Sequence, residues 1–249
     1  MYRFFVRPEQ IRDGNIEITG DDVHHIRQVL RMRPGEEVLV SSGDDWEYTC
    51  RITALEDERV SAQILDVQKP GRELTSRLYL FQCIPKGDKM EWIVQKAVEL
   101  GAYSIVPFAA KRSVVKLDEK KAAKKQARWQ AIAKGAAEQS GRGIVPEVRD
   151  VRTFGEALKT AAELDVILIP YELEEGMRET VRVIESIVPG QSVGIFIGPE
   201  GGFEEEEVEL AKAAGAHPVT LGKRILRTET AGPAALSILM YYLESRTAG

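Results

Sequence analysis

The chain has 249 residues, of which 43% are hydrophobic, so it is long enough to form one large domain or two smaller ones with real cores. Its formal net charge of -5 excludes a general attraction to nucleic acid, and any such contact must use local basic patches. The two cysteines and three histidines show neither the spacing of a disulfide framework nor that of a metal site, so we predict no metal.

The beginning of the chain, MYRFFVRPEQ, contains no apolar run of the kind that directs secretion. No stretch of the sequence approaches the roughly 18 consecutive apolar residues that a membrane span needs. We therefore expect neither a secretory signal nor a membrane contact, and the expected location is the cytoplasm.

The first region, residues 1–70, is predicted to be a small β-rich domain with one packed helix. Short, partly alternating runs of apolar residues predict strands at 37–45, 46–55 and 59–67. The segment TGDDVHHIRQVLRM, residues 19–32, predicts the helix, because four apolar residues fall on one face. These are Val23, Ile26, Val29 and Leu30.

The second region, residues 74–249, follows a short linker with Pro70 and Gly71 and alternates between strand and helix patterns. The predicted strands are 77–84, 104–108, 165–170, 193–198 and 218–222. The predicted helices are 87–101, 118–140, 177–187, one that begins near Glu204, and 231–245. Strands joined by helices predict an α/β fold with a mostly parallel sheet that helices cover on both faces.

A glycine-rich turn, GPEGG at residues 198–202, lies between a predicted strand and an acidic helix. Glu204–Glu207 suit a helix N-terminus, but they argue against a bound phosphate there, and the spacing matches neither a P-loop nor a dinucleotide motif. A ligand without phosphate, cationic or zwitterionic, fits this turn better, and S-adenosylmethionine is a common cofactor of that kind.

A second glycine turn, LGKRILRTETA at residues 221–231, precedes the apolar last helix. Thr228 or Thr230 can cap that helix, but capping does not explain an arginine and a glutamate between buried elements. In open α/β sheets, ligands bind at the carboxyl ends of neighbouring strands, which is where both turns are predicted to lie.

With these motifs the chain resembles the RsmE family, which consists of SPOUT-superfamily methyltransferases that modify N3 of a uridine in small-subunit (16S) ribosomal RNA. The resemblance rests on four segments, which occur in that family's order and extend the match over essentially the whole chain. In chain order they are KGDKMEWIVQKAVELGAYSIVPF, RWQAIAKGAAEQSGRGIVPEV, IGPEGGFEEEE and LGKRILRTETA. It implies a PUA-like RNA-binding domain at 1–70, a SPOUT domain with a trefoil knot at 74–249, and a homodimer. The expected substrate is small-subunit ribosomal RNA, either as naked RNA or within the assembled subunit.

The resemblance also implies that S-adenosylmethionine lies against the two glycine turns, largely on backbone groups. The residues implied in cofactor binding are Ile197, Gly198, Glu200, Gly201, Gly202, Leu221, Gly222, Ile225, Leu226, Arg227, Thr228 and Thr230.

Methylation at N3 of uracil requires loss of the N3 proton, which a carboxylate with a raised pKa can accept. This loss leaves negative charge on the ring oxygens, which a cation can stabilise. Arg227 is the predicted cation, with an ion pair to Glu229 or Glu200 as the alternative. Glu229, Glu138 and Glu99 are the candidate proton acceptors, each of which could instead orient a neighbour.

Local basic residues are the candidates for RNA contacts. The predicted set is Arg3, Arg7, His24, Arg27 and Arg31 in the first region and Lys86, Lys89 and Arg142 in the second. The segment 111–128, with eight basic and two acidic residues, is either a phosphate track or a solvated helix face.

Two other functions compete with this one. A knotted methyltransferase of the ribose 2′-hydroxyl would carry Asn and Ser where this chain has RTETAGPAAL. A catalytically silent RNA-binding module need not bind the cofactor, so cofactor binding discriminates it.

Overall fold

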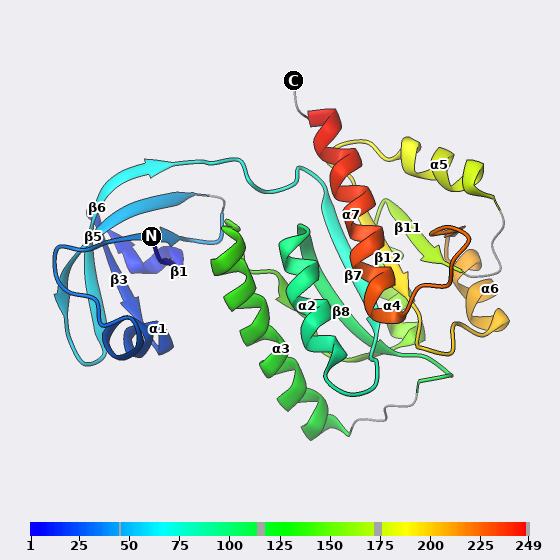
Figure 1. Cartoon of the computed structure of the whole chain (residues 1–249), viewed down its shortest axis with the longest axis horizontal. Helices are drawn as coiled ribbons and strands as arrows, with labels where there is room; N and C mark the ends of the chain where they lie inside the picture. The colour runs from blue at the N-terminus through cyan, green and yellow to red at the C-terminus, as the bar shows by residue number, and fades with distance from the viewer. Residues whose placement is uncertain (45, 114–117, 172–175, 248–249) are drawn as a thin grey trace. The chain divides into compact units, whose positions relative to one another are not determined.

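The computed structural model describes residues 1–44, 46–113, 118–171 and 176–247, and the chain divides into two compact units (Figure 1). The first unit comprises Met1–Glu73 and Ala137–Val145. The second comprises Leu74–Ala136 and Pro146–Gly249.

The first unit is built on a six-stranded sheet with the strand order β1-β4-β5-β6-β3-β2. Its strands are β1 (Arg3–Phe5), β2 (Ile11–Arg12), β3 (Asn15–Thr19), β4 (Glu37–Ser41), β5 (Glu47–Leu55) and β6 (Arg59–Gln68). The pair β1–β4 is parallel and the other pairs are antiparallel. Alternation such as NIEIT in β3, whose two isoleucines are buried, directs one face of the sheet toward an aliphatic core.

The helix predicted at 19–32 is shorter and less regular than expected. The α-helix α1 (Asp21–His24) passes directly into a π-helix at His25–Val29. A π-helix has more residues per turn than an α-helix, so the predicted apolar face is not maintained. Val29 is consequently 62% exposed, whereas Val23 and Ile26 are buried as predicted.

The second unit contains a seven-stranded sheet in which every pairing is parallel, with the order β10-β8-β7-β12-β11-β13 and β9 beside β8. Its strands are β7 (Arg77–Cys83), β8 (Ala102–Ala109), β9 (Glu147–Val148), β10 (Arg152–Thr153), β11 (Val166–Pro170), β12 (Ser192–Ile197) and β13 (Ala216–Val219). The helices are α2 (Lys89–Glu99), α3 (Glu119–Ser140), α4 (Phe154–Ala161), α5 (Met177–Ser186), α6 (Glu205–Ala213) and α7 (Thr228–Thr247).

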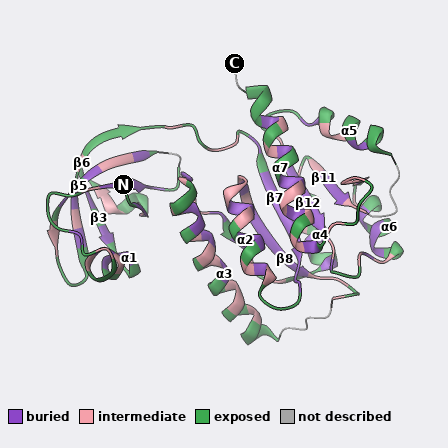
Figure 2. Ribbon diagram, in the orientation of Figure 1, coloured by how far each residue is buried: buried purple, intermediate pink, exposed green. Residues whose placement is uncertain are grey.

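Helices cover both faces of this sheet, as predicted for a parallel sheet whose strands are apolar on both sides. Helix α7 packs against α2, β7 and β12, and residues of α4 and α6 join the core on the other face. Figure 2 shows β7 and β12 as buried strands between these layers. The predicted fold, a β-rich domain followed by a mostly parallel sheet covered by helices, is confirmed in this arrangement.

Helix α4 is absent from the sequence prediction. Its start carries a reciprocal capping box, in which the Thr153 hydroxyl accepts from the backbone N–H of Glu156 and the Glu156 carboxylate accepts from the backbone N–H of Thr153. The pattern Thr-x-x-Glu was therefore available in the sequence as a signal for this helix.

The chain returns from β13, at one edge of the sheet, to the middle of the sheet, where α7 lies against β7 and β12. In a knotted protein, the end of the chain has to return in this way from the edge of the sheet toward its middle. The trefoil knot itself stays a prediction of the family resemblance.

Candidate active site

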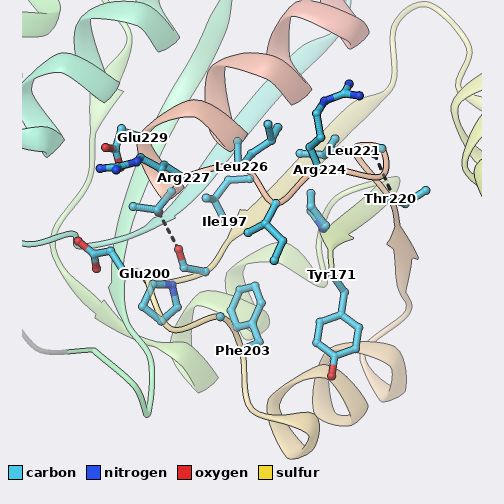
Figure 3. A pocket seen from close by; sticks show the side chains of 18 of the residues that line it. Tyr171, Ile197, Glu200, Phe203, Thr220, Leu221, Arg224, Leu226, Arg227 and Glu229 are labelled. Carbon is cyan, nitrogen blue, oxygen red and sulfur yellow. Dashed lines mark hydrogen bonds between the residues drawn. The ribbon is translucent and has the colours of Figure 1, made fainter. Parts of the chain in front are cut away.

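A cavity of about 370 Å³ lies where three neighbouring strands of the second unit end (Figure 3). Pro170 and Tyr171 reach it from β11, the turn after Ile197 reaches it from β12, and Thr220–Gly222 reach it from β13. The segment that leads into α7 closes the cavity. This is the crevice in which open α/β sheets bind ligands, as the sequence predicts.

Most residues implied in cofactor binding line this cavity. They are Ile197, Gly198, Glu200, Gly202, Leu221, Gly222, Ile225, Leu226, Arg227 and Thr228. Gly201 and Thr230 are not among the lining residues. The carbonyl of Gly201 accepts a hydrogen bond of 2.7 Å from Arg112, and the backbone N–H of Thr230 donates to Arg227 within the first turn of α7.

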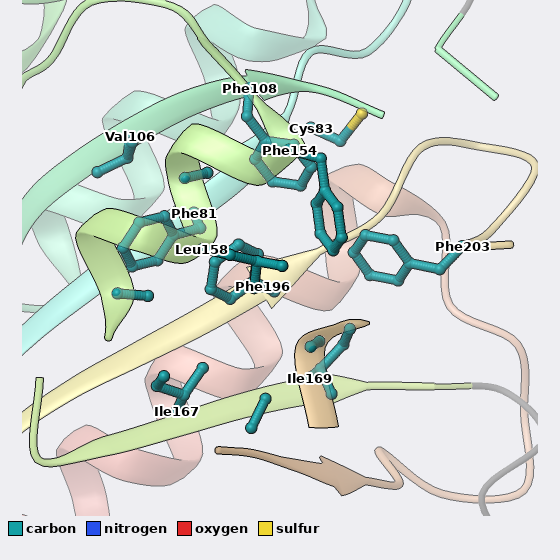
Figure 4. Packing of buried hydrophobic residues seen from close by; sticks show 14 of the residues in the cluster. Phe81, Cys83, Val106, Phe108, Phe154, Leu158, Ile167, Ile169, Phe196 and Phe203 are labelled. Atoms are coloured by element: carbon teal, nitrogen blue, oxygen red, sulfur yellow. The ribbon is translucent and has the colours of Figure 1, made fainter. Parts of the chain in front are cut away.

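The first glycine turn is held in place by Phe203. The Phe203 ring packs with Phe108 and Phe154 in the aromatic core on one face of the sheet (Figure 4). In the same core, the rings of Phe81 and Phe196 stack with their centroids 4.3 Å apart. A Cβ atom on Gly198 would lie 3.1 Å from the Phe203 ring, so a larger residue would require that ring to shift. Sequence reasoning missed Phe203, although an aromatic residue directly after GPEGG was its signal.

The second turn is tied to the first by a side chain. The Thr228 hydroxyl donates a hydrogen bond of 2.7 Å to the carbonyl of Gly198. The hydroxyl therefore bonds across the cavity rather than capping α7, which corrects the interpretation of Thr228 as the cap. Gly222 adopts φ +110°, a conformation that favours glycine, and its N–H donates to the Thr220 hydroxyl.

The run of glutamates, which was predicted to argue against a bound phosphate at the first glycine turn, does not line the cavity. Glu204 forms a bidentate pair with Arg112, and Glu206 pairs with Lys111. Glu207 is buried, and its carboxylate accepts the backbone N–H of Lys111 at 2.9 Å. These charges fasten the loop after β8 to the N-terminus of α6, and Lys111 and Arg112 are thereby paired rather than free for phosphate.

The other end of the predicted basic segment is also paired, because Arg128 donates to Glu91 at 2.9 Å. Residues 114–117 of that segment lie outside the described residues.

Five charged side chains line the cavity: Lys89, Glu200, Arg224, Arg227 and Glu229. The Lys89 ammonium lies 3.5 Å from Glu200 and 3.2 Å from Glu229, and the backbone N–H of Lys86 donates to Glu200 at 3.0 Å. Lys89 was predicted to contact RNA, but here it holds two carboxylates. Within the described ranges, Arg227 has no ion pair with either carboxylate, so the alternative role predicted for Arg227 is taken by Lys89.

Both carboxylates at the cavity are held in the ionised form. A hydrogen bond from its own backbone N–H lowers the pKa of Glu229, burial opposes this, and the charges of Lys89 and Arg227 add to the lowering. Burial raises the pKa of Glu200, but the Lys86 N–H and the Lys89 charge outweigh it, so the net shift is also downward.

These shifts correct one expectation, because a proton acceptor was predicted to have a raised pKa. Of the three candidate acceptors, Glu229 alone lines the cavity. Glu99 pairs with Lys96 at 2.8 Å, and Glu138 lies in the part of α3 that belongs to the first unit.

Two of the arginines predicted to bind RNA are buried in ion pairs of the first unit. Arg3 is 7% exposed and pairs with Glu47 and the Ser41 hydroxyl. Arg142 is 5% exposed and pairs with Glu73 at 2.6 Å. The contacts that these two guanidinium groups make in the structure are therefore with protein, and their contact with RNA stays a prediction.

The remaining candidates are accessible to different degrees. Arg7, His24, Arg31 and Lys86 are exposed, and Arg31 has an unusual φ of +53°. Arg27 is half-buried and pairs with Asp57 at 2.9 Å. Their part in RNA binding stays a prediction.

Further lining residues were not singled out from the sequence as ligand contacts: Pro170, Tyr171, Pro199, Thr220, Arg224 and Ala231. Tyr171 follows β11, and the rule that places ligands at strand ends was sufficient to select it.

No group of acidic, histidine or cysteine residues in the described part of the chain could hold a metal ion. Among those same residues, no helix is long and apolar enough to cross a membrane.

Comparison with known protein families defines the class of this fold and site. Residues 72–240 match the family described as RNA methyltransferase domain, and residues 18–65 match the RNA methyltransferase PUA domain. The cavity and its two glycine turns lie within the first match.

Individual proteins give a finer comparison. The chain is 42% identical to ribosomal RNA small subunit methyltransferase E of Bacillus subtilis, over 98% of each sequence. It is 35% identical to the protein of the same name from Synechocystis, over 98% of this chain and 78% of that protein. The structure of ribosomal RNA small subunit methyltransferase E from Neisseria gonorrhoeae bound to S-adenosyl methionine is 35% identical, covers 97% of each chain and has a TM-score of 0.82. The chain belongs to this family, the RsmE family, which confirms the resemblance on which the sequence analysis relied.

Proposed function

We propose that the protein is an S-adenosylmethionine-dependent methyltransferase that methylates N3 of a uridine in 16S ribosomal RNA. The observation that carries this proposal is the cavity formed by both glycine turns, with an arginine at its edge that has no ion pair among the described residues. The relatives in the family support the reaction class, because they are ribosomal RNA small subunit methyltransferases and one of them is bound to S-adenosyl methionine.

The lining of the cavity fits this cofactor. Its volume of about 370 Å³ falls within the usual range for small-molecule sites. Ile197, Leu221 and Leu226 offer apolar contacts for the adenine of the cofactor. The glycine turns offer backbone groups for hydrogen bonds to it. When bound, the cofactor supplies a methyl group on a sulfonium centre, activated for in-line transfer.

Arg227 is assigned the role of stabilising the reacting base. Once N3 has lost its proton, the ring carries negative charge on its two oxygens, and a guanidinium can donate hydrogen bonds to that charge. Because Glu200 and Glu229 both form their ion pairs with Lys89, Arg227 stays available for this contact. The same guanidinium lowers the free energy of the deprotonated base and so favours loss of the N3 proton.

Glu229 is our candidate for the proton acceptor, since it lines the cavity and is kept ionised. The lowered pKa of Glu229 makes its carboxylate a weak proton acceptor. Proton transfer therefore depends on stabilisation of the deprotonated uracil ring by Arg227. Glu138 is retained as a candidate only for a conformation in which it reaches the substrate.

The two domains have separate tasks in this proposal. Residues 1–70 bind RNA through exposed residues such as Arg7, His24 and Arg31, and residues 74–249 carry out methyl transfer. The substrate is ribosomal RNA in the assembled small subunit, which places the reaction in the cytoplasm.

The homodimer implied by the resemblance is also part of the proposal. Helix α7 buries Leu236, Leu239 and Leu243 against its own unit, while Ile238 is 44% and Tyr241 is 75% exposed. Exposed apolar residues on an otherwise packed helix support an interface there. Light scattering during size-exclusion chromatography tests it, because a mass of about one chain at micromolar concentration would contradict the dimer.

The decisive experiment uses methyl-labelled S-adenosylmethionine and small ribosomal subunits from cells that lack the modification. After incubation with the purified protein, the labelled nucleoside is identified by mass spectrometry. We expect label in 3-methyluridine.

Two other outcomes would each overturn part of the proposal. Label in a ribose methyl group would keep the reaction class and reject N3 as the acceptor. Absence of label on competent subunits, together with absence of cofactor binding, would favour an RNA-binding protein without catalysis.

A further inference from the structure

Gln82 is a polar residue in the buried centre of the second unit that sequence reasoning did not single out. Gln82 lies in β7 and is 0% exposed. The same strand contains Leu78, Leu80, Phe81 and Cys83, which are also fully buried. Strand β7 lies between β8 and β12, so the side chain is far from either edge of the sheet.

The amide of Gln82 is connected to the cavity through one hydroxyl group. Its Nε2 donates to the carbonyl of Cys83 at 2.9 Å and to the Thr228 hydroxyl at 3.0 Å. The Thr228 hydroxyl in turn donates to the carbonyl of Gly198 at 2.7 Å. Gln82 does not line the cavity, whereas Thr228 and Gly198 both do.

The orientation of the amide is determined by its partners. A backbone carbonyl can only accept a hydrogen bond, so the group that faces Cys83 has to be the Nε2 donor. The same NH₂ group then points at Thr228, whose hydroxyl oxygen must accept from it and must direct its single proton elsewhere. That proton goes to Gly198, which joins the second glycine turn to the first.

The opposite side of the amide shows that this arrangement has a cost. The Oε1 atom of Gln82 is buried and has no hydrogen-bond partner. A buried acceptor without a partner destabilises the fold, and an apolar side chain of similar shape would avoid that loss. Fold stability alone therefore does not account for a glutamine at this position.

The surroundings make room for the amide. A Cβ atom on Gly232, in α7, would lie 3.2 Å from Oε1 of Gln82 and 3.5 Å from Leu80. Glycine at 232 thus lets α7 approach β7 closely enough for Thr228, one turn earlier in the helix, to reach the amide.

We propose that Gln82 is a positioning residue for the cofactor: by orienting the Thr228 hydroxyl toward Gly198, it fixes the separation of the two glycine turns that enclose S-adenosylmethionine. The inference rests on the proposed function, since it concerns the binding of that cofactor. Gln82 acts from behind the cavity and touches neither the cofactor nor the RNA.

The test measures the Kd for S-adenosylmethionine by calorimetry and the Tm of the cofactor-free protein, for the wild type and four variants of the full chain. Gln82→Met removes the donor but keeps a similar size, and Thr228→Val removes the hydroxyl but keeps the shape. Thr228→Ser keeps the hydroxyl and serves as the matched control. The double variant Gln82→Met/Thr228→Val shows whether the two residues act as a unit.

We expect Gln82→Met and Thr228→Val each to raise the Kd about fivefold to tenfold, the effect of one lost hydrogen bond. The double variant should bind no more weakly than Thr228→Val alone, and Thr228→Ser should stay within about twofold of the wild type. The Tm of Gln82→Met should not fall, because this change also removes the unpaired acceptor. With saturating cofactor, Gln82→Met should leave kcat nearly unchanged while KM for the cofactor rises.

The opposite results overturn the inference. Wild-type affinity in Gln82→Met, or effects of the two changes that multiply in the double variant, would show that Gln82 does not act through Thr228. A lowered Tm with unchanged affinity would assign Gln82 to the fold alone. Should Gln82→Met not fold, Gln82→Leu replaces it in the same scheme. Failure of the wild type to bind the cofactor would instead reject the proposed function, and the inference with it.

Discussion

The two units use charged side chains in opposite ways. In the first unit, Arg3 and Glu47 pair with both side chains almost fully buried, at 5% and 3% exposure. At the cavity of the second unit, Lys89, Glu200 and Glu229 pair while 34%, 32% and 21% of their side chains remain exposed.

The two groups of charges differ in whether a charged side chain is left without an ion-pair partner. The buried pairs of the first unit are satisfied on both sides, and removing one partner would strand a charge away from water. The half-exposed group at the cavity leaves Arg227 without an ion pair among the described residues. A basic residue that has no partner is the one available for a substrate, whereas a basic residue in a buried pair belongs to the fold.

The largest effect should follow from breaking a buried pair. Glu47→Gln leaves the Arg3 charge buried without its carboxylate, and we expect a loss of about 3–5 kcal/mol of stability in the first unit. Urea unfolding followed by circular dichroism measures it. As a matched control, Glu37→Gln breaks the exposed pair with Arg51 and should change stability little.

The same pair predicts how stability depends on pH. Burial raises the pKa of Glu47, but the hydrogen bond and charge of Arg3 and the charge of Arg72 lower it below the ordinary value. A lowered folded-state pKa contributes stability that is present above the ordinary carboxyl pKa and is lost as the pH falls through the folded value. Acid unfolding should therefore be less steep in Glu47→Gln than in the wild type, and equal slopes would contradict this assignment.

A comparably large effect on catalysis is expected at the cavity. Arg227→Ala should lower kcat about 100- to 1,000-fold and leave the Kd for S-adenosylmethionine nearly unchanged, because the guanidinium acts on the reacting base. Arg182→Ala, on the exposed face of α5, is the control. If Arg227→Ala instead weakens cofactor binding and spares kcat, Arg227 belongs to the cofactor site.

A smaller effect should follow from disturbing the charges that keep Arg227 available. Lys89→Met leaves Glu200 and Glu229 without their ammonium, and we expect one of them to pair with Arg227 and lower kcat about tenfold. Lys89→Arg keeps the charge and should retain most of the activity. Single-turnover kinetics with saturating cofactor separates this effect from binding, and an unchanged rate in Lys89→Met would show that Arg227 does not depend on Lys89.

The smallest effect concerns RNA binding by the first unit. Arg31→Ala removes one exposed guanidinium and should reduce the dependence of log K on log salt concentration by about one unit per phosphate lost. Arg51→Ala removes an arginine that is paired with Glu37 and should leave the slope unchanged. Filter binding to small-subunit RNA over a range of salt concentrations measures both, and equal slopes for the two variants would remove Arg31 from the RNA contact.

The sequence was sufficient for features that depend on local pattern. The turns at GPEGG and LGKRILRTETA were predicted to meet because parallel strands place their carboxyl ends at one edge of a sheet, and the cavity lies there. The capping box at Thr153 and Glu156 was equally local, and α4 could have been predicted from it.

Features that depend on distant partners could not be predicted. Arg3 and Glu47 are 44 residues apart, and Arg142 and Glu73 are 69 apart, so their sequences give no sign that these arginines are buried. The same applies to the glutamates of α6, whose partners Lys111 and Arg112 are 92 to 96 residues earlier in the chain. Local charge therefore suggested contacts with RNA where tertiary structure supplies contacts with protein.

The bond between Gln82 and Thr228 joins residues that are 146 positions apart, and Thr228 begins the last helix of the chain. Synthesis proceeds from the N-terminus at roughly 5–20 residues per second, so most of the second unit exists for several seconds before this bond can form. Contacts of such long sequence separation are also slow to form, because the entropy of loop closure opposes them. The cavity is thus completed only when the end of the chain has been made, and a partly synthesised chain with its PUA-like domain already folded could meet RNA before it can hold a methyl donor.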